Sequence, residues 1–132
     1  MNNLLRWEIA KMVHKSGEGH IPSSYSIVDI LYFLYREVLS YDITNPDWEG
    51  RDYFVLSKGH GCGALWAVLK EFGFITANDV SSYSKFQGIL GGHPDTVKVP
   101  GVEASTGSLG HGFPYAVGIA LGLRIKSQKN KV

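Results

Sequence analysis

Three histidines in separate segments of the sequence, His20, His60 and His93, each stand next to a glycine. Because glycine has no Cβ, a ligand can approach the imidazole and the neighbouring main chain together. Histidine also exchanges its proton near neutral pH, which suits it to proton transfer and to polarising a carbonyl group. Any one of these histidines alone is better explained as structural. Three in the same setting, each at the end of a predicted element, favour a shared functional site.

The glycine- and hydroxyl-rich segment STGSLGHG, residues 105–112, is a second candidate site. It directly precedes a predicted helix, whose first N–H groups and dipole attract an anion such as a phosphate, or a polar heterocycle. The segment lacks the lysine of a phosphate-binding P-loop, and a turn that packs a helix explains it equally well. His111 within it is undecided, whereas His14 lies inside a predicted helix and is expected to be structural.

Other chemical candidates are few. Glu18 lies two residues before His20, and Asp95 two after His93, so either carboxylate could orient an imidazole, although loop carboxylates are more often solvated. Cys62 is the only cysteine, which excludes an internal disulfide and a cysteine-based zinc site; we expect it to pack near a helix start. No acidic pair has metal-ligand spacing, so we assign no metal ligand.

Length and charge limit the class of protein. The 132 residues carry a net charge of +1 and are 44% hydrophobic, enough for the core of one domain. This balance argues against nucleic acid as a partner, which normally needs a clustered basic face. No apolar run approaches the roughly 20 residues of a membrane span. Charges at Arg6, Glu8 and Lys11 also interrupt any signal core, so we expect a cytoplasmic protein without a membrane partner.

The hydrophobic pattern predicts an α/β fold with helices packed on the start of a parallel sheet. Residues 53–56 form a continuous apolar run, which is typical of a buried parallel strand. A tight glycine turn at 57–61 and a helix follow, which together make half of a βαβ unit. The long loop at 85–105 is expected to form part of a site. The predicted helices span residues 3–14, 27–39, 62–72, 76–83 and 109–127.

Local signals refine these helices. Gly17 is expected to end the first helix, and capping-box spacing predicts helix starts at Ser26 and Thr76. The helix at 27–39 is apolar around most of its circumference, which predicts burial on more than one side. Gly118 and Gly122 lie four residues apart and predict a smooth face for close packing.

Taken in order, the segments SGEGHIPSS, FVLSKGHGCGAL, GGHPD, PGVEASTGSLGHG and AVGIALGL resemble the N-terminal, diphosphate-binding module of transketolase. The resemblance is closest to the N-terminal subunit of transketolases made as two chains, and it covers roughly residues 5–125. It implies that residues 1–132 are the N-terminal portion of the diphosphate-binding domain, with a partial thiamine-diphosphate-binding fold.

The resemblance also implies an activity: thiamine-diphosphate-dependent transfer of a two-carbon ketol unit between sugar phosphates, by a larger or multi-chain enzyme. In that family the cofactor is the electron sink, and the protein supplies orientation and proton transfers. The position of His20 lies near the reacting oxygens of the substrate, that of His60 by the cofactor diphosphate, and that of His93 at the donor hydroxyls. The resemblance thus implies three catalytic residues, His20, His60 and His93, and four cofactor-binding residues, His60, Gly107, Ser108 and Leu109.

The sequence departs from the family pattern beside the expected site. Glu18 and the segment 21–23 differ from the usual residues near substrate and cofactor, which leaves the sugar donor open. Ser108 and His111 differ from many full-length enzymes and are closer to the split forms. The family's metal ligands fall beyond residue 132, so Mg²⁺ or Ca²⁺ is expected in the complete enzyme with none of its ligands in this chain.

The expected partners are a C-terminal transketolase subunit or a second copy of the chain, with sugar phosphates as substrates. Three alternatives stay open at this point. The chain could act on a modified sugar, serve as a non-catalytic assembly subunit that keeps the glycine-packed surface, or be a truncated remnant of such an enzyme.

Overall fold

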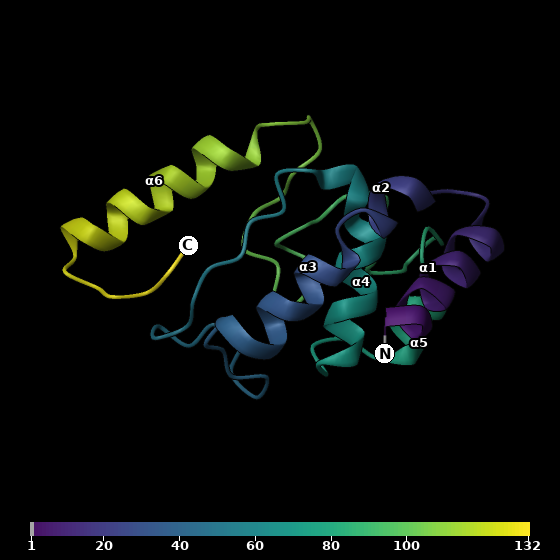
Figure 1. Ribbon diagram of the computed structural model, residues 1–132, viewed down its shortest axis with the longest axis horizontal. Helices are drawn as coiled ribbons and strands as arrows, with labels where there is room; N and C mark the ends of the chain where they lie inside the picture. The colour runs from purple at the N-terminus through teal and green to yellow at the C-terminus, as the bar shows by residue number, and fades with distance from the viewer. Residues whose placement is uncertain (1) are drawn as a thin grey trace.

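The computed structural model describes residues 2–132 as helices joined by long loops (Figure 1). No β-strand occurs within this range. The elements are α1 (Asn2–Ser16), α2 (Ile21–Tyr25), α3 (Val28–Phe33), the π-helical turn η1 (Leu34–Val38), the 3₁₀ turn η2 (Gly59–Gly61), α4 (Cys62–Glu71), α5 (Ala77–Ser81) and α6 (Gly112–Ile125).

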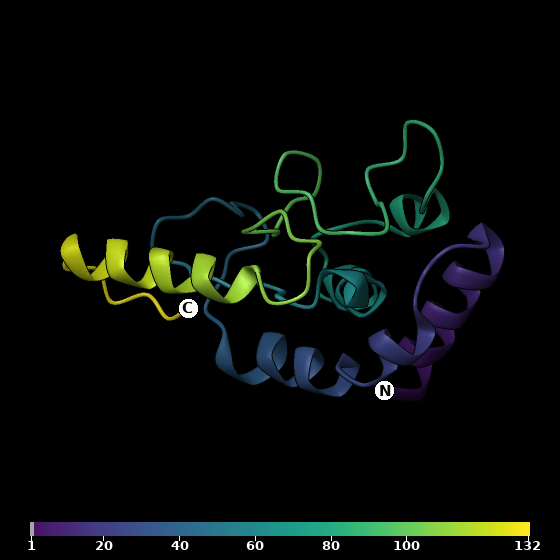
Figure 2. The ribbon, with the colours of Figure 1, turned by 90° about the horizontal axis from the view of Figure 1, so that it is seen from above.

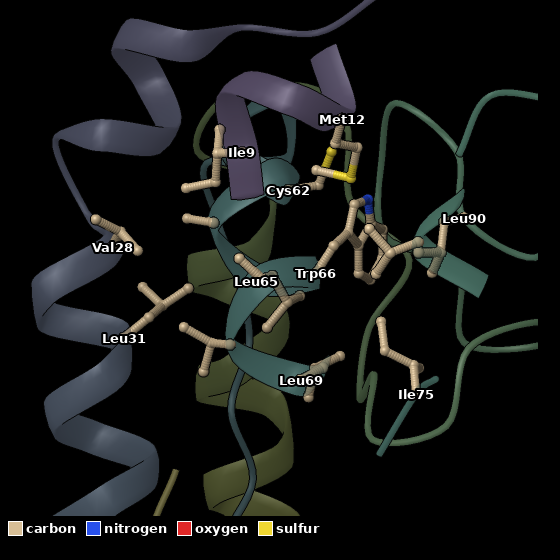
Figure 3. Packing of buried hydrophobic residues seen from close by; sticks show 14 of the residues in the cluster. Ile9, Met12, Val28, Leu31, Cys62, Leu65, Trp66, Leu69, Ile75 and Leu90 are labelled. Carbon is tan, nitrogen blue, oxygen red and sulfur yellow. The ribbon is translucent and has the colours of Figure 1, made fainter. Parts of the chain in front are cut away.

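Helix α4 forms the centre of the core, because every residue from Cys62 to Leu69 is buried. Helices α1, α2, α3 and α5 pack against it, and the loop at 85–105 lies on the side opposite α3 (Figure 2). A helix covered on all sides must be apolar all round, and the sequence CGALWAVL satisfies this requirement. Figure 3 shows Val28 and Leu31 of α3 on one side of α4, and Leu90 of the loop near Trp66.

Three predicted helices are confirmed, as α1, α4 and α5. Gly17 ends α1 as expected, with a φ of 73° and its amide donating to the Val13 carbonyl over 2.9 Å. The capping box of α5 is also present. The Thr76 hydroxyl accepts from the Asp79 amide at 3.2 Å, and the Asp79 carboxylate accepts from the Thr76 amide at 2.7 Å.

The helix expected at 27–39 is confirmed in its extent, because α3 and η1 follow one another without a gap over residues 28–38. The turn expected before it is wrong. The segment α2, which was expected to be a turn, is helical because Pro22 suits the first turn of a helix. Ile27, with φ −124° and ψ −11°, then separates α2 from α3. The last turn relaxes into π geometry, with the Leu39 amide donating to the Leu34 carbonyl over 2.9 Å.

The predicted cap and burial of this region are corrected as well. Ser26 does not cap α3, because its hydroxyl donates to the Ser23 carbonyl. Asp29 instead pairs with Arg6 of α1. Ile30 and Phe33 are each 59% exposed, so α3 buries one face only, the face that meets α4.

The strand expected at 53–56 is not formed within residues 2–132, and neither is a parallel sheet. A strand requires a ladder of hydrogen bonds to a neighbouring strand. Here single bonds come from separate loops. The Tyr53 amide donates to the Lys131 carbonyl over 2.8 Å, and the Leu56 carbonyl accepts from the Thr106 hydroxyl over 2.7 Å.

Helix α6 stands apart from the other helices (Figures 1 and 2). It begins at Gly112, three residues later than expected. Phe113 and Ile125 on α6 are 71% and 84% exposed. The close packing expected at Gly118 and Gly122 is absent from the described structure, since a Cβ added to either would have no atom within 4 Å. In residues 2–132, no helix is both long enough and apolar enough to span a membrane.

Candidate functional site

Two of the predicted catalytic side chains lie in contact. The rings of His20 and His60 are 5.5 Å apart between centroids and meet edge to face at 83°. His20 directly precedes α2, and His60 is the central residue of η2. The His20 side chain is exposed and that of His60 half-buried, so both imidazoles can meet a ligand.

The histidine pair is held together because α2 is docked on the turn that carries His60. The Lys58 ammonium donates to the Ser23 carbonyl at 3.1 Å and to the Ser26 hydroxyl at 2.8 Å. The buried Ser24 hydroxyl points to the carbonyl of Gly61, 3.4 Å away. These contacts join residues about 35 positions apart in the sequence.

The same turn packs closely on the glycine-rich segment before α6. A Cβ added to Gly59 would lie 2.7 Å from the Thr106 carbonyl oxygen and 2.9 Å from the Gly107 nitrogen, so the approach requires glycine. The Gly110 amide donates to the Ser57 carbonyl at 3.3 Å. The segment at 105–112 therefore lies against the turn that carries His60.

His93 joins the site from the long loop. The Gly91 carbonyl accepts hydrogen bonds from the Trp66 indole N–H at 3.1 Å and from the Cys62 thiol at 3.6 Å, which ties this part of the loop to α4. A Cβ added to Gly107 would lie 3.5 Å from Cδ2 of His93. Since Gly107 also lies against Gly59, His93 and the turn that carries His60 both border Gly107.

Cys62 has a structural role, as expected. It is 2% exposed at the start of α4. Burial raises the pKa of its thiol to about 12, which keeps the sulfur protonated and unreactive.

The predicted cofactor-binding residues lie along this region. Gly59, the neighbour of His60, lies against the backbone of Gly107. Ser108 and Leu109 follow Gly107 in the sequence and are exposed residues before α6. The main chain beside them is open. A Cβ added to any one of Gly91, Gly92 and Gly110 would have no atom within 4 Å.

The remaining candidates lie elsewhere or face other groups. The Asp95 carboxylate accepts from the Val97 amide at 2.9 Å and so is engaged in its own loop. His14 is an exposed residue of α1. His111 precedes α6 without a side-chain cap bond. Within the range that the structure describes, no three His, Cys, Asp or Glu side chains gather closely enough to hold a metal ion.

Sequence reasoning missed the residues that assemble the site, chiefly Lys58, Ser24 and Trp66. Their partners are distant in the sequence, so no local spacing marks them. The one available signal was the position of Lys58, immediately before the Gly59–His60 pair.

Comparison with protein families matches residues 1–131 to the family described as "Transketolase, thiamine diphosphate binding domain". The chain belongs to the transketolase family. This match confirms the resemblance drawn from the sequence motifs, and the family description agrees with thiamine diphosphate as the expected cofactor.

Two similar proteins, one of them named as a transketolase subunit, match most of this chain. Ferredoxin fas2 of Rhodococcoides fascians is 45% identical over 86% of this chain and 38% of its own length. An apulose-4-phosphate transketolase subunit of Phocaeicola vulgatus is 38% identical over 91% of this chain and 42% of its own length. The chain therefore spans about two fifths of the length of these relatives.

Among solved structures, a transketolase from Leishmania mexicana superposes with a TM-score of 0.86 at 36% identity, covering 91% of this chain and 18% of that one. The structural relatives are thus α/β proteins, which agrees with the predicted fold class, although the described residues hold no sheet.

The residues present fit a cofactor of the transketolase type. The open main chain at Gly91, Gly92 and Gly110 offers room for a ligand against the backbone. The paired imidazoles of His20 and His60 border the same region and supply hydrogen-bonding ring nitrogens.

Proposed function

We propose that this chain contributes to a transketolase-type enzyme that transfers a two-carbon ketol unit between sugar phosphates. The carrying observation is that three histidines far apart in the sequence are brought to the backbone of Gly107. His20 contacts His60, and the turn that carries His60 and the ring of His93 both border Gly107. Family membership and the relative named as an apulose-4-phosphate transketolase subunit support the same activity.

In this proposal His60, Gly107, Ser108 and Leu109 bind thiamine diphosphate. When bound, that cofactor supplies an electron sink for breaking and forming the carbon–carbon bond. Gly107 presents its main chain next to His93, since a Cβ added there would lie 3.5 Å from Cδ2 of that ring. The exposed Ser108 hydroxyl can donate to an acceptor on the ligand.

The three imidazoles orient the sugar and move its protons. The rings of His20 and His60 meet edge to face with their centroids 5.5 Å apart, so both border the same region. His93, carried by a different loop, approaches from the side of Gly107 and binds hydroxyls at the reacting end of the donor.

The active unit is proposed to be larger than this chain. Residues 1–132 would be the N-terminal portion of the diphosphate-binding domain, and the segment at 53–56 would become a strand once neighbouring strands are supplied. The complete enzyme would hold Mg²⁺ or Ca²⁺ through ligands outside these residues. The apolar exposure of α6 and the greater length of the relatives support a partner, either a C-terminal subunit or a second copy. A cytoplasmic location stays a prediction.

The test is a ketol-transfer assay on the assembled enzyme with thiamine diphosphate, Mg²⁺ and sugar phosphates. H20A and H93A should each lower kcat by about 100-fold or more, the usual effect of losing a general acid or base. H14A is the matched control, since His14 is exposed on α1 outside the site, and it should retain activity. Equal activity in all three variants would refute the proposal.

A non-catalytic assembly subunit is the second candidate, favoured by the exposed apolar side chains of α6. It predicts that H20A, H60A and H93A leave partner binding and complex activity unchanged. A loss of complex activity in H93A alone, with the complex intact by size-exclusion chromatography, would count against this alternative.

A further inference from the structure

A closed group of three hydrogen bonds links α2 to the turn that carries His60. The Lys58 ammonium donates to the Ser26 hydroxyl at 2.8 Å and to the Ser23 carbonyl at 3.1 Å. The Ser26 hydroxyl in turn donates to the same carbonyl at 2.9 Å. An ammonium group only donates and a hydroxyl has a single proton, so the direction of all three bonds is fixed.

Helix α2 also has polar bonds to other elements. The hydroxyl of Tyr25, its last residue, donates to the Arg6 carbonyl of α1 at 2.8 Å. The helix has only five residues, and His20 at its start makes no side-chain cap bond. The Ser24 hydroxyl reaches the Gly61 carbonyl over 3.4 Å, at the long end of the hydrogen-bond range. The Tyr25 bond joins α2 to α1, whereas the bonds from Lys58 are the shorter ones that join α2 to the turn that carries His60. The placement of His20 against His60 therefore depends on the contacts at Ser23 and Ser26.

Lys58 is suited to that grip by its own position. It precedes η2, whose first turn is closed by a 2.8 Å bond from the Gly61 amide to the Lys58 carbonyl. Its side-chain stem lies along Gly61, where an added Cβ would be 3.7 Å from the Lys58 Cδ. The residue is thus attached to the His60 turn through its main chain and to α2 through its ammonium group.

We propose that Lys58 is a positioning residue that sets the edge-to-face contact between His20 and His60. The effect of Lys58 on catalysis rests on the proposed transketolase-type function, whereas its effect on the contact between the two rings does not. The side chain acts through two donated bonds, so a donor of similar length should replace it in part and an apolar side chain of similar length should not.

The test measures the histidine contact directly in the 132-residue chain by NMR, through the cross-relaxation between the His20 and His60 ring protons. K58M should reduce this cross-peak at least twofold and move both sets of ring shifts, K58R should restore most of it, and S26A should give an intermediate loss. K85M is the matched control, because Lys85 is exposed and takes no part in the bonds between α2 and the turn that carries His60.

The Trp66 indole N–H signal, which reports the bond to Gly91, serves as the measure of folding. An unchanged cross-peak in K58M with an intact Trp66 signal would overturn the proposal. If K58M does not fold, S26A decides by the same criterion, because it deletes the hydroxyl and leaves the lysine in place.

In the assembled enzyme, K58M should lower kcat about tenfold or more with little change in KM, because a small misplacement of a proton-transfer group affects the chemical step. K58R should recover most of this loss. Wild-type enzyme without ketol transfer would refute the proposed function, yet the NMR result would still decide the role of Lys58.

Discussion

The contact between Gly59 and the glycine-rich segment allows a sharp prediction for the variant G59A. The added Cβ would lie 2.7, 2.8 and 2.9 Å from the Thr106 carbonyl oxygen, the Thr106 carbonyl carbon and the Gly107 nitrogen. Ordinary van der Waals contact begins at 3.4 Å. All three atoms belong to the main chain, so no side-chain rotation relieves the overlap and one of the two segments must move by several tenths of an ångström.

Overpacking of this kind typically costs about 1–3 kcal/mol of folding free energy. We expect G59A to lose that amount in urea denaturation followed by tryptophan fluorescence. In the assembled enzyme it should also weaken thiamine diphosphate binding, because the His60 turn and Gly107 separate. G92A is the matched control, since a Cβ at Gly92 meets no atom within 4 Å. If G59A were as stable as G92A, the close approach of the two main-chain segments would be wrong.

Three further predictions concern contacts between segments that are distant in the sequence. E103Q should lower the free energy of unfolding by about 2–3 kcal/mol in urea denaturation. The Glu103 carboxylate accepts two hydrogen bonds from Arg51, at 2.7 and 3.0 Å, and the two side chains are only 12% and 15% exposed. An unchanged free energy of unfolding would refute this prediction. Burial alone would raise the pKa of Asp52, but hydrogen bonds from two backbone amides and the charge of a lysine lower it. Its stabilisation is therefore present near neutral pH and lost as the pH falls below about 4, and D52N should reduce that pH dependence of the urea midpoint. W66F should cost about 1–3 kcal/mol and speed amide exchange around Gly91, because the carbonyl there loses its indole donor; unchanged exchange would contradict it.

The sequence predicted well what depends on neighbouring residues. The ends of α1 and α5 follow from Gly17 and from the Thr76–Asp79 capping box, which involve contacts within four residues. The predictions failed where side chains distant in the sequence bind a residue that a local motif would otherwise use. Ser26 and Asp29 have capping-box spacing, but Ser26 accepts from Lys58 and Asp29 pairs with Arg6, so the predicted cap was replaced by tertiary bonds.

The predicted strand at 53–56 failed for a related reason. An apolar run indicates that a segment is buried, but a strand forms only when a neighbouring strand pairs with it through hydrogen bonds. Within residues 2–132 the segment meets loops instead. The close packing predicted for α6 is not formed within residues 2–132 either. Most of its apolar side chains are exposed, and a Cβ added to Gly118 or Gly122 would have no atom within 4 Å.

The residue types of the candidate site could be predicted from the sequence, but the contacts that bring these residues together could not. Glycine beside each of His20, His60 and His93 marked the chemistry, because it opens the main chain next to a titratable ring. What brings these residues together is a set of long-range bonds from side chains with no motif of their own, such as the Lys58 ammonium and the Trp66 indole. Substituting the histidines therefore tests the chemistry, whereas substituting Lys58, Gly59 or Trp66 tests the assembly of the site. If both sets of variants lose activity but only the second alters the spacing of the histidine rings, the two roles are separated.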